Sequence, residues 1–354
     1  MTFAINTIGL QAYPTDFDIE FLEELVLFTA LQQPNNRFIF ITNKPINTSE
    51  GLPINCSFKM VKANPKNALG LFYFSTIILP LLFKKLMPHV VIDIAGYGSI
   101  ATEIPQVIVA KNHTKKTLQN ANQILVGSQF EKEQLLEKYQ IPNTKFKTIT
   151  GVANPIFTPL NYVESSITKD GYADGREYFL SAANNYSYDD FIDLLKAFSL
   201  FKRWQKSSMK LLVIGSISDY KNQLSEKIPT YKYRDDIVLL PTVTDDQRAR
   251  LFGAAYGILS LVNQSNFALP ILQALQTSVP IICVENEAFK THFTSAVLFV
   301  PKNDTSAVAD QMKLLYRDEN LRTKLITKGS QLASKFTYVK SAATLWKSII
   351  AATK

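Results

Sequence analysis

The chain of 354 residues is long enough for two domains of ordinary size, and its 46% hydrophobic and 19% charged residues are typical of a globular protein. Its net charge of +8 favours phosphates, nucleic acids or anionic membrane surfaces as partners, unless the excess is simply spread over a solvated surface. No long block of one charge sign is present, so the sequence predicts no nucleic-acid-binding arm.

Short apolar runs alternate with helical patterns through the first half of the chain. Residues 128–139 predict a helix with Ser128 as its N-cap and Glu131 as the partner in a capping box. Runs rich in β-branched residues predict strands at 37–42 (RFIFIT), 89–94 (HVVIDI), 105–110 (PQVIVA) and 124–127 (ILVG).

A strongly apolar segment covers residues 68–83 (ALGLFYFSTIILPLLF) and is followed by Lys84 and Lys85. It is shorter than the roughly 20 residues that a membrane span needs, and Pro80 interrupts it. The pattern favours a buried helix. The alternative is a helix whose exposed apolar rim contacts an anionic membrane surface, with the lysines at the headgroups.

The second half begins with a polar segment, residues 161–176, that contains two glycines and has no clear period; it is predicted to link two domains. A second alternation follows, in which apolar strands separated by helices indicate a parallel sheet with helices on both faces. The predicted strands are 178–181, 210–215, 237–240, 257–261 and 280–284, and the predicted helices are 188–204, 245–255 and one beginning near Leu269.

Two such blocks predict an α/β protein of two Rossmann-like domains, with a ligand cleft between them at the carboxyl ends of the strands. Cysteine and histidine are too scarce and scattered to indicate a metal site or a disulfide framework. Residues 1–10 lack the features of a signal peptide, so we expect a protein of the reducing cytoplasm.

From about residue 121 to the C-terminus the sequence resembles the retaining glycosyltransferases of family 4, also called group 1. Residues 121–139 (ANQILVGSQFEKEQLLEKY) resemble the family's strand, serine and helix, and residues 150–159 (TGVANPIFTP) resemble its turn ending in Phe-x-Pro. Residues 267–284 (FALPILQALQTSVPIICV) resemble the segment usually written FGLPxLEAMAxGxPVI. The order and spacing of these pieces make the resemblance specific.

The resemblance implies a GT-B fold, in which two Rossmann-like domains face each other across a cleft. It implies an N-terminal, acceptor-side domain over 1–160, a linker over 161–176 and a donor-binding domain over 177–335. A C-terminal helix over 336–354 is expected to cross back to the first domain.

Members of this family move a sugar from a nucleoside diphosphate without a metal ion, so cations and helix N-termini must meet the charge on the leaving diphosphate. By resemblance, Asn184 and Asp189 stand where the family has Arg and Lys, and Ser265 and Gln273 stand where it has two glutamates. Further donor contacts are implied for Pro241, Thr242 and Val243 near the base, and for Asn266, Phe267, Ala268 and Leu269.

These replacements should affect donor binding to different degrees. Gln273 can still hydrogen-bond ribose hydroxyls, whereas Ser265, expected at the catalytic position beside the donor sugar, carries no charge. Asp189 sets a negative charge near the diphosphate. At about 4 Å and an effective dielectric near 20 such a repulsion costs on the order of 4 kcal/mol.

A basic loop follows the strand at 105–110, where Lys111, Lys115 and Lys116 surround His113. One interpretation is that the lysines serve a donor phosphate or the acceptor, with His113 as the remnant of a catalytic histidine of the family. The other is a solvated basic turn. Gly9 is the only glycine of the first-strand loop, where the family has a pair.

Tyr186 and Tyr188 follow Asn184 in the loop after the strand at 178–181. Aromatic side chains there could stack on a base or a sugar. Packing in the core or simple exposure is the favoured interpretation.

The sequence therefore predicts a glycosyltransferase of polysaccharide biosynthesis that uses a nucleotide sugar as co-substrate, no metal cofactor and a glycan or lipid-linked acceptor. No nucleic-acid partner is expected. The protein would work in the cytoplasm or peripherally on the inner face of the membrane. The alternative is a catalytically inactive GT-B protein that serves as a binding or partner subunit, and a GT-B epimerase is less favoured because it would need its own acidic and histidine residues.

Overall fold

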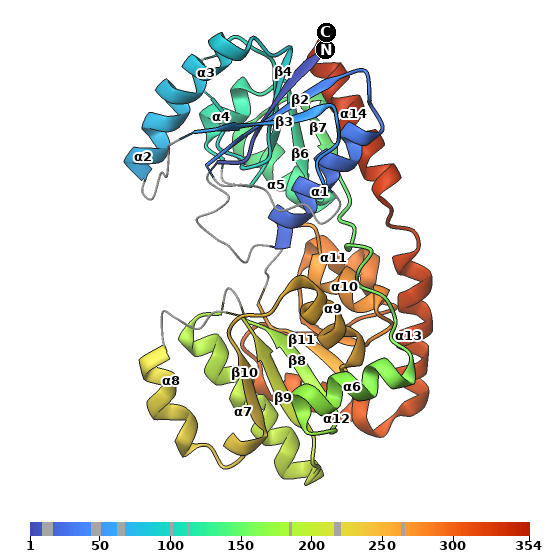
Figure 1. Ribbon diagram of the computed structural model, residues 1–354. Helices are drawn as coiled ribbons and strands as arrows, with labels where there is room; N and C mark the ends of the chain where they lie inside the picture. Colours follow the sequence, from blue (N-terminus) through green and yellow to red (C-terminus); the bar gives the residue numbers. More distant parts are fainter. Residues whose placement is uncertain are drawn as a thin grey trace. The chain divides into compact units, whose positions relative to one another are not determined.

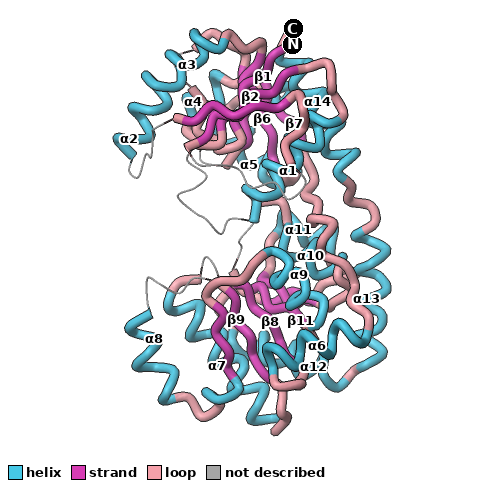
Figure 2. Tube along the Cα trace, viewed as in Figure 1, coloured by secondary structure: helices cyan, strands magenta, loops and turns pink. Residues whose placement is uncertain are grey.

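The computed structural model describes residues 1–8, 17–43, 51–61, 68–99, 102–111, 113–183, 186–215, 221–262 and 266–354 (Figure 1). The chain divides into two units, which we call unit 1 (Met1–Val152 with Thr337–Lys354) and unit 2 (Ala153–Phe336). Figure 2 shows a sheet flanked by helices in each unit. The prediction of two parallel-sheet α/β domains is confirmed.

Unit 1 is built on seven parallel strands in the order β3-β2-β1-β4-β5-β6-β7. Its central strands are buried on both faces, which explains their nearly continuous apolar sequences. The strand order reverses between β1 and β4, so this is the topological switch point of the sheet. The strands are β1 (Thr2–Asn6), β2 (Arg37–Thr42), β3 (Cys56–Met60), β4 (Val90–Asp93), β5 (Gln106–Val109), β6 (Gln123–Val126) and β7 (Phe146–Thr148).

The last helix of the chain, α14 (Tyr338–Ala352), belongs to unit 1 and packs on α1 (Phe17–Leu31), as the red and blue ribbons of Figure 1 show. The Tyr338 ring lies against Phe28, and its hydroxyl bonds to the Glu24 carboxylate. Ser341 donates to the Thr150 carbonyl oxygen at 2.7 Å. These contacts secure the end of the chain to the first unit.

The other helices of unit 1 are α4 (Lys115–Asn120), α5 (Gln129–Tyr139) and an interrupted helix formed by α2 (Ala68–Tyr73), a π-helix (Phe74–Ile78) and α3 (Leu79–Leu86). The π-turn comes just before Pro80, which has no N–H to donate and cannot continue the regular bonding pattern. Ser128 caps α5 by accepting from the Glu131 N–H at 3.0 Å, as predicted. The predicted capping box is wrong, because the Glu131 carboxylate accepts from the Gly127 N–H and not from the Ser128 N–H.

The helix over 68–86 is only partly buried, which corrects the expectation of a mostly buried segment. Phe74, Leu79 and Phe83 enter the core of unit 1. Tyr73, Ile77 and Leu81 recur every fourth residue and are exposed, as is Phe72. A helix that lies on a core buries one face, so the apolar residues of its other face are exposed.

Unit 2 contains six parallel strands in the order β10-β9-β8-β11-β12-β13, and its switch point lies between β8 and β11. Right-handed crossovers put α7 on one face and α9 and α10 on the other. The strands are β8 (Tyr178–Ala182), β9 (Lys210–Ile214), β10 (Ile237–Leu240), β11 (Gly257–Ser260), β12 (Ile281–Val284) and β13 (Leu298–Val300). The helices are α6 (Tyr162–Ala173), α7 (Tyr188–Gln205), α8 (Lys221–Lys227), α9 (Asp245–Ala254), α10 (Leu269–Gln276), α11 (Glu287–Phe293), α12 (Thr305–Arg317) and α13 (Glu319–Ala333).

The expected linker over 161–176 is wrong, because residues 162–173 form helix α6, which packs on α9 within unit 2. Asn161 and Glu164 form a capping box that starts this helix despite its polar sequence. The chain also enters unit 2 earlier than residue 160. Phe157 is fully buried and its ring meets Phe252 of α9 edge-on at 5.5 Å.

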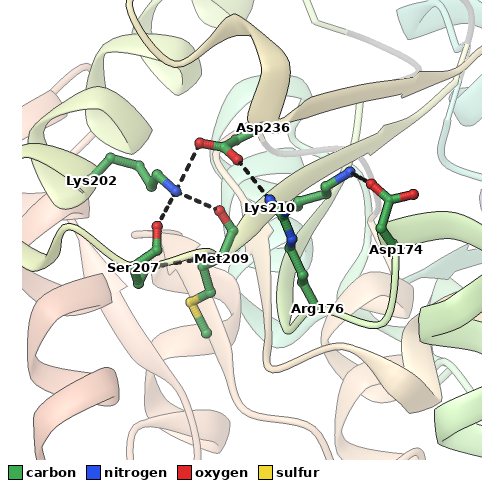
Figure 3. Close-up of polar contacts among 7 residues, drawn as sticks. All are labelled: Asp174, Arg176, Lys202, Ser207, Met209, Lys210 and Asp236. Carbon is green, nitrogen blue, oxygen red and sulfur yellow. Dashed lines mark hydrogen bonds and ion pairs between the residues drawn. The ribbon is translucent and has the colours of Figure 1, made fainter.

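A network of charged side chains occupies the amino edge of the unit 2 sheet (Figure 3). The buried Lys202 ammonium contacts Asp236 at 2.8 Å and donates to the carbonyl oxygens of Ser207 and Met209. Arg176 joins the other oxygen of Asp236 at 3.6 Å. Lys210 pairs with Asp174 beside it. The network ties the ends of α6 and α7 to the starts of β9 and β10.

Candidate functional site

The candidate site lies at the carboxyl edge of the unit 2 sheet, around the switch point between β8 and β11. In parallel α/β sheets the loops that leave such a point diverge and form a crevice that binds ligands. The strand register sets Leu259 of β11 beside Ser181 of β8, so the chain segments that leave these strands start from neighbouring positions. The residues implied as donor contacts follow β8, β10 and β11.

Pro241, Thr242 and Val243 come directly after β10, where Pro241 and Thr242 are exposed and Val243 is half-buried. Thr244 then caps α9, with its hydroxyl oxygen accepting from the Gln247 N–H. The segment therefore runs along the carboxyl edge with its side chains in solvent. Its backbone carries the groups that could recognise a base.

Helix α10 begins at this edge with an unusual backbone conformation. Its N-cap, Ala268, is left-handed, with φ 56° and ψ 28°, and is buried. Glycine favours this conformation, because a Cβ atom makes it costly by roughly 1–2 kcal/mol. The family pattern has glycine here, so the chain retains the backbone geometry although the residue has changed. Phe267 and Leu269 on either side are buried in the core of unit 2.

Gln273, in the second turn of α10, is 4% exposed. Its side-chain oxygen Oε1 is buried and accepts no hydrogen bond from the part of the chain that the structure describes. A buried acceptor that lacks a donor costs about 1–3 kcal/mol and requires an explanation. Among the described residues, the side-chain oxygens of Gln123 and Gln311 share this state. A ligand hydroxyl that donates to Oε1 of Gln273 would supply an explanation.

Asp189 lies in the first turn of α7 and is exposed to solvent. The adjacent Asp190 completes a capping box with Ser187, accepting from the Ser187 N–H at 2.9 Å. Both carboxylates interact favourably with the positive end of the helix dipole. This explains why the fold accommodates a negative charge at this position, for which the sequence resemblance implied a lysine in the family.

A hollow lies beside this site, over the carboxyl ends of β12 and β13. Three carboxylates stand on its rim, and each is engaged. Asp190 caps α7, Asp304 caps α12 and Asp193 pairs with Lys196 at 3.0 Å. None of the implied donor contacts that the structure describes lines the hollow.

The basic loop of unit 1 does not form one cluster of cations. Lys111 is paired with the buried Asp18 of α1 at 3.3 Å, so it is not the free cation that the sequence suggested. Lys115 and Lys116 are exposed in the first turn of α4. His113 meets the ring of Tyr139 edge-on, and its Nδ1 is buried without a partner among the described residues. Burial, and then the nearby Lys138, lower the pKa of His113, so its imidazole is neutral.

Two carboxyl groups with raised pKa values lie at the carboxyl edge of the unit 1 sheet, Asp93 fully buried and Glu131 partly buried. Asp93 accepts from Asn6 Nδ2 at 2.9 Å and from the N–H groups of Gly96 and Gly98, and burial raises its pKa. Burial also raises the pKa of Glu131 to about 7, against the lowering effect of its bond from the Gly127 N–H. The sequence analysis recognised Glu131 only as a capping residue.

Three of the predicted site residues, Gly9, Asn184 and Ser265, lie outside the described residues. Among the residues that are described, no group of three acidic, histidine or cysteine side chains could hold a metal ion. The same part of the chain contains no helix long and apolar enough to cross a membrane.

Tyr186, which the sequence placed either in the core or on a base, is 5% exposed and belongs to the core of unit 2. Tyr188 is the first residue of α7 and is half-buried against the same core. Stacking on a ligand is therefore not the role of the Tyr186 ring.

In sequence, the family model described as glycosyl transferases group 1 matches residues 164–332, which is most of unit 2. The O-antigen chain mannosyltransferase RfbU of Salmonella typhimurium is 18% identical over 202 residues, which cover 56% of this chain. The match spans 52% of that relative, about half its length.

In structure, a glycosyltransferase from Rickettsia africae matches with a TM-score of 0.77 and 16% identity, over 98% of this chain and 97% of its own. HepE of Anabaena, solved in complex with UDP-glucose, matches with a TM-score of 0.75 and 10% identity, over 98% of each chain. The chain thus resembles the group 1 glycosyltransferases and has the GT-B fold of two Rossmann-like domains.

Proposed function

We propose that this protein is a retaining glycosyltransferase of the family 4 type, in which unit 2 binds a nucleotide sugar and the sugar passes to a glycan or a lipid-linked acceptor. The observation that carries the proposal is the buried, unpartnered Oε1 of Gln273. It stands where the family has a glutamate for the ribose, and a ribose hydroxyl is a donor of the right kind.

The remaining donor contacts follow from the same edge of the sheet. The backbone of residues 241–243 would hold the base, and the N-terminus of α10 would face the diphosphate. Backbone N–H groups and the helix dipole favour an anion whatever side chains stand nearby. Because these groups and exposed cations would meet the phosphate charge, the proposed reaction uses the nucleotide sugar as co-substrate and no metal ion.

In unit 1, Lys115 and Lys116 are the exposed cations that we propose for a phosphate or the acceptor. Lys111 would first have to leave Asp18, because the pair is largely buried and charge-compensated. His113 keeps its proposed role near the acceptor only as a neutral imidazole, which could accept a proton at Nδ1.

The test is a thermal-shift screen of the full chain over nucleoside diphosphates and nucleotide sugars, followed by titration of the best ligand, because a ligand of the folded state raises its stability. Gln273→Leu should weaken binding about tenfold, since a lost hydrogen bond to a hydroxyl is worth about 1.4 kcal/mol. Gln273→Glu restores an acceptor and should bind at least as well as the wild type. No binding by any nucleotide, or full binding by Gln273→Leu, would overturn the proposal.

A second candidate function, an inactive GT-B protein that binds a ligand or a partner, is favoured by the exposed carboxylate of Asp189. If that carboxylate repels the diphosphate, Asp189→Lys should tighten nucleotide binding. Asp246→Lys, in the corresponding first turn of α9, is the matched control. Equal affinities in both variants would show that the diphosphate does not lie near α7. Binding of a nucleotide sugar without transfer or hydrolysis would favour the inactive protein.

We also propose that unit 1 attaches to an anionic membrane surface through the interrupted helix over 68–86. Its exposed stripe of Tyr73, Ile77 and Leu81 ends at the exposed Lys84 and Lys85. Unit 1 has 17 Lys and Arg against 11 Asp and Glu, so it carries +6 of the net charge of +8. Apolar residues beside basic ones suit the boundary between headgroups and acyl chains.

The full chain should sediment with vesicles that contain an anionic phospholipid at low salt, and rising salt should release it. The double variant Ile77→Ser/Leu81→Ser should lose most of this binding. Leu31→Ser removes an equally exposed leucine from α1, and it should bind like the wild type. Wild-type protein that stays in the supernatant at low salt would contradict the membrane proposal and leave donor binding untouched.

A further inference from the structure

A chain of buried hydrogen bonds joins β8 to the end of β11 at the switch point of unit 2. Ser181 of β8 donates to the Leu259 carbonyl oxygen at 3.0 Å. The Tyr186 hydroxyl lies 3.0 Å from Ser181 Oγ, and it accepts from the Leu261 N–H at 3.0 Å.

The direction of this chain is fixed by its ends. The Ser181 hydrogen goes to a carbonyl, so Ser181 Oγ accepts from the Tyr186 hydroxyl, and the Tyr186 oxygen accepts from an amide. The Leu261 N–H therefore donates to the Tyr186 hydroxyl, which donates to Ser181 Oγ, which donates to the Leu259 carbonyl oxygen. Each donor has one acceptor. Burial raises the pKa of Tyr186 to about 12, so the phenol keeps its proton.

Packing alone does not explain a tyrosine at this position. The Tyr186 ring is enclosed by the apolar core of unit 2, where a phenylalanine ring would fill almost the same space. The hydroxyl adds the bond to Leu261, which is the first residue beyond β11. Leu261 begins the segment that leads to Ala268 and the N-terminus of α10.

We propose that Tyr186 is a positioning residue for the donor site, because its hydroxyl fixes where the chain leaves β11 and so sets α10 and Gln273 relative to the end of β8. The inference rests on the proposed function for its ligand, a nucleotide sugar, while the hydrogen-bond chain itself belongs to the fold. A small displacement of the groups that hold a ligand is enough to weaken binding.

The same strand provides a matched control. Tyr178, the first residue of β8, is fully buried, and its hydroxyl donates to the Leu251 carbonyl oxygen at 2.8 Å. Tyr186→Phe and Tyr178→Phe each remove one buried phenolic hydroxyl from unit 2. Both should lower the Tm by a similar few degrees. They act at opposite ends of β8, and only Tyr186 contacts the segment that leads to α10.

The experiment compares the full chain and both variants in nucleotide titration and in hydrogen exchange. Tyr186→Phe should raise the dissociation constant for the nucleoside diphosphate about fivefold and speed exchange at 259–262, while Tyr178→Phe should do neither. A Tyr186→Phe variant with the affinity and exchange of Tyr178→Phe would overturn the inference. If the wild type binds no nucleotide, the proposed function fails, and exchange at 259–262 still decides whether Tyr186 holds the end of β11.

Discussion

The two units secure their switch points with different chemistry. In unit 1, β1 is joined to β4 by the bond from Asn6 to the Asp93 carboxylate, which also receives the N–H groups of Gly96 and Gly98. In unit 2, β8 is joined to β11 by the neutral hydroxyls of Ser181 and Tyr186. One buried carboxyl group organises a whole turn, whereas two hydroxyls hold only the end of a strand.

The difference extends to the balance of charge in each unit. In unit 2 the buried Lys202 and Lys210 lie at the amino edge of the sheet and pair with Asp236 and Asp174 (Figure 3), while the buried Arg248 of α9 pairs with Asp245. Unit 1 holds two carboxyl groups of raised pKa at the carboxyl edge, the buried Asp93 and the partly buried Glu131. Mutations at these positions should therefore affect the units differently.

The largest effect is expected from Asp93→Ala. It leaves the Asn6 amide and two buried N–H groups without their acceptor, and each orphaned group costs about 1–3 kcal/mol, so unit 1 should lose roughly 4 kcal/mol or more. Gly98, with φ 61° and its Cα packed beside Ile108, depends on this turn. Hydrogen exchange should accelerate in β1 and β4 but not in β8 and β11. The control is Asp235→Asn, which changes a highly exposed carboxylate. Exchange in β1 and β4 of Asp93→Ala that is as slow as in the wild type would refute the role of Asp93.

Asp236→Ala should have the next largest effect, confined to unit 2. It leaves the buried Lys202 ammonium without its ion-pair partner, and breaking such a pair costs about 3 kcal/mol. The double variant Asp236→Ala/Lys202→Met should recover part of the lost stability, because it also removes the uncompensated charge. Urea denaturation of the two single variants and the double variant measures this coupling. Nucleotide affinity should not change, since the network lies at the opposite edge of the sheet from the candidate site.

The smallest effect concerns pH and Glu131. Its folded pKa of about 7 lies above its usual value of 4.5, so this group makes the folded state less stable as pH rises from about 4.5 to 7. Glu131→Gln should reduce this slope, to which Glu23 with its pKa of about 7 also contributes, and should stabilise the protein above pH 7 by at most about 3 kcal/mol, since one pKa unit is worth about 1.4 kcal/mol. Denaturation midpoints between pH 5 and 8 provide the measurement. The control is Glu133→Gln, at an exposed position of the same helix, which should leave the slope unchanged. An unchanged slope in Glu131→Gln would show that a group other than Glu131 causes the pH dependence.

The sequence by itself determined the class of fold and most elements of unit 2, but it did not predict β1, α1, β3 or β7 of unit 1. The run at 37–42 and the helix over 188–204 were predicted nearly to the residue, because buried parallel strands are continuously apolar and long helices show a clear period. Helix α6 was missed because its polar sequence has no apolar period, and packing on α9 stabilises it instead. Strand β13 was missed because its 3 residues are too few to show a strand pattern.

Only the tertiary structure decided what the site residues do. The sequence placed Lys111 in a basic loop, but its partner Asp18 is 93 positions away. It placed Tyr186 in a loop after β8, but the bond to Leu261 spans 75 positions. It marked Gln273 as a replaced glutamate, while its burial without a partner became visible only in the folded unit. Local sequence sets helix and strand preference, whereas pairing and burial depend on residues that meet only when the chain folds.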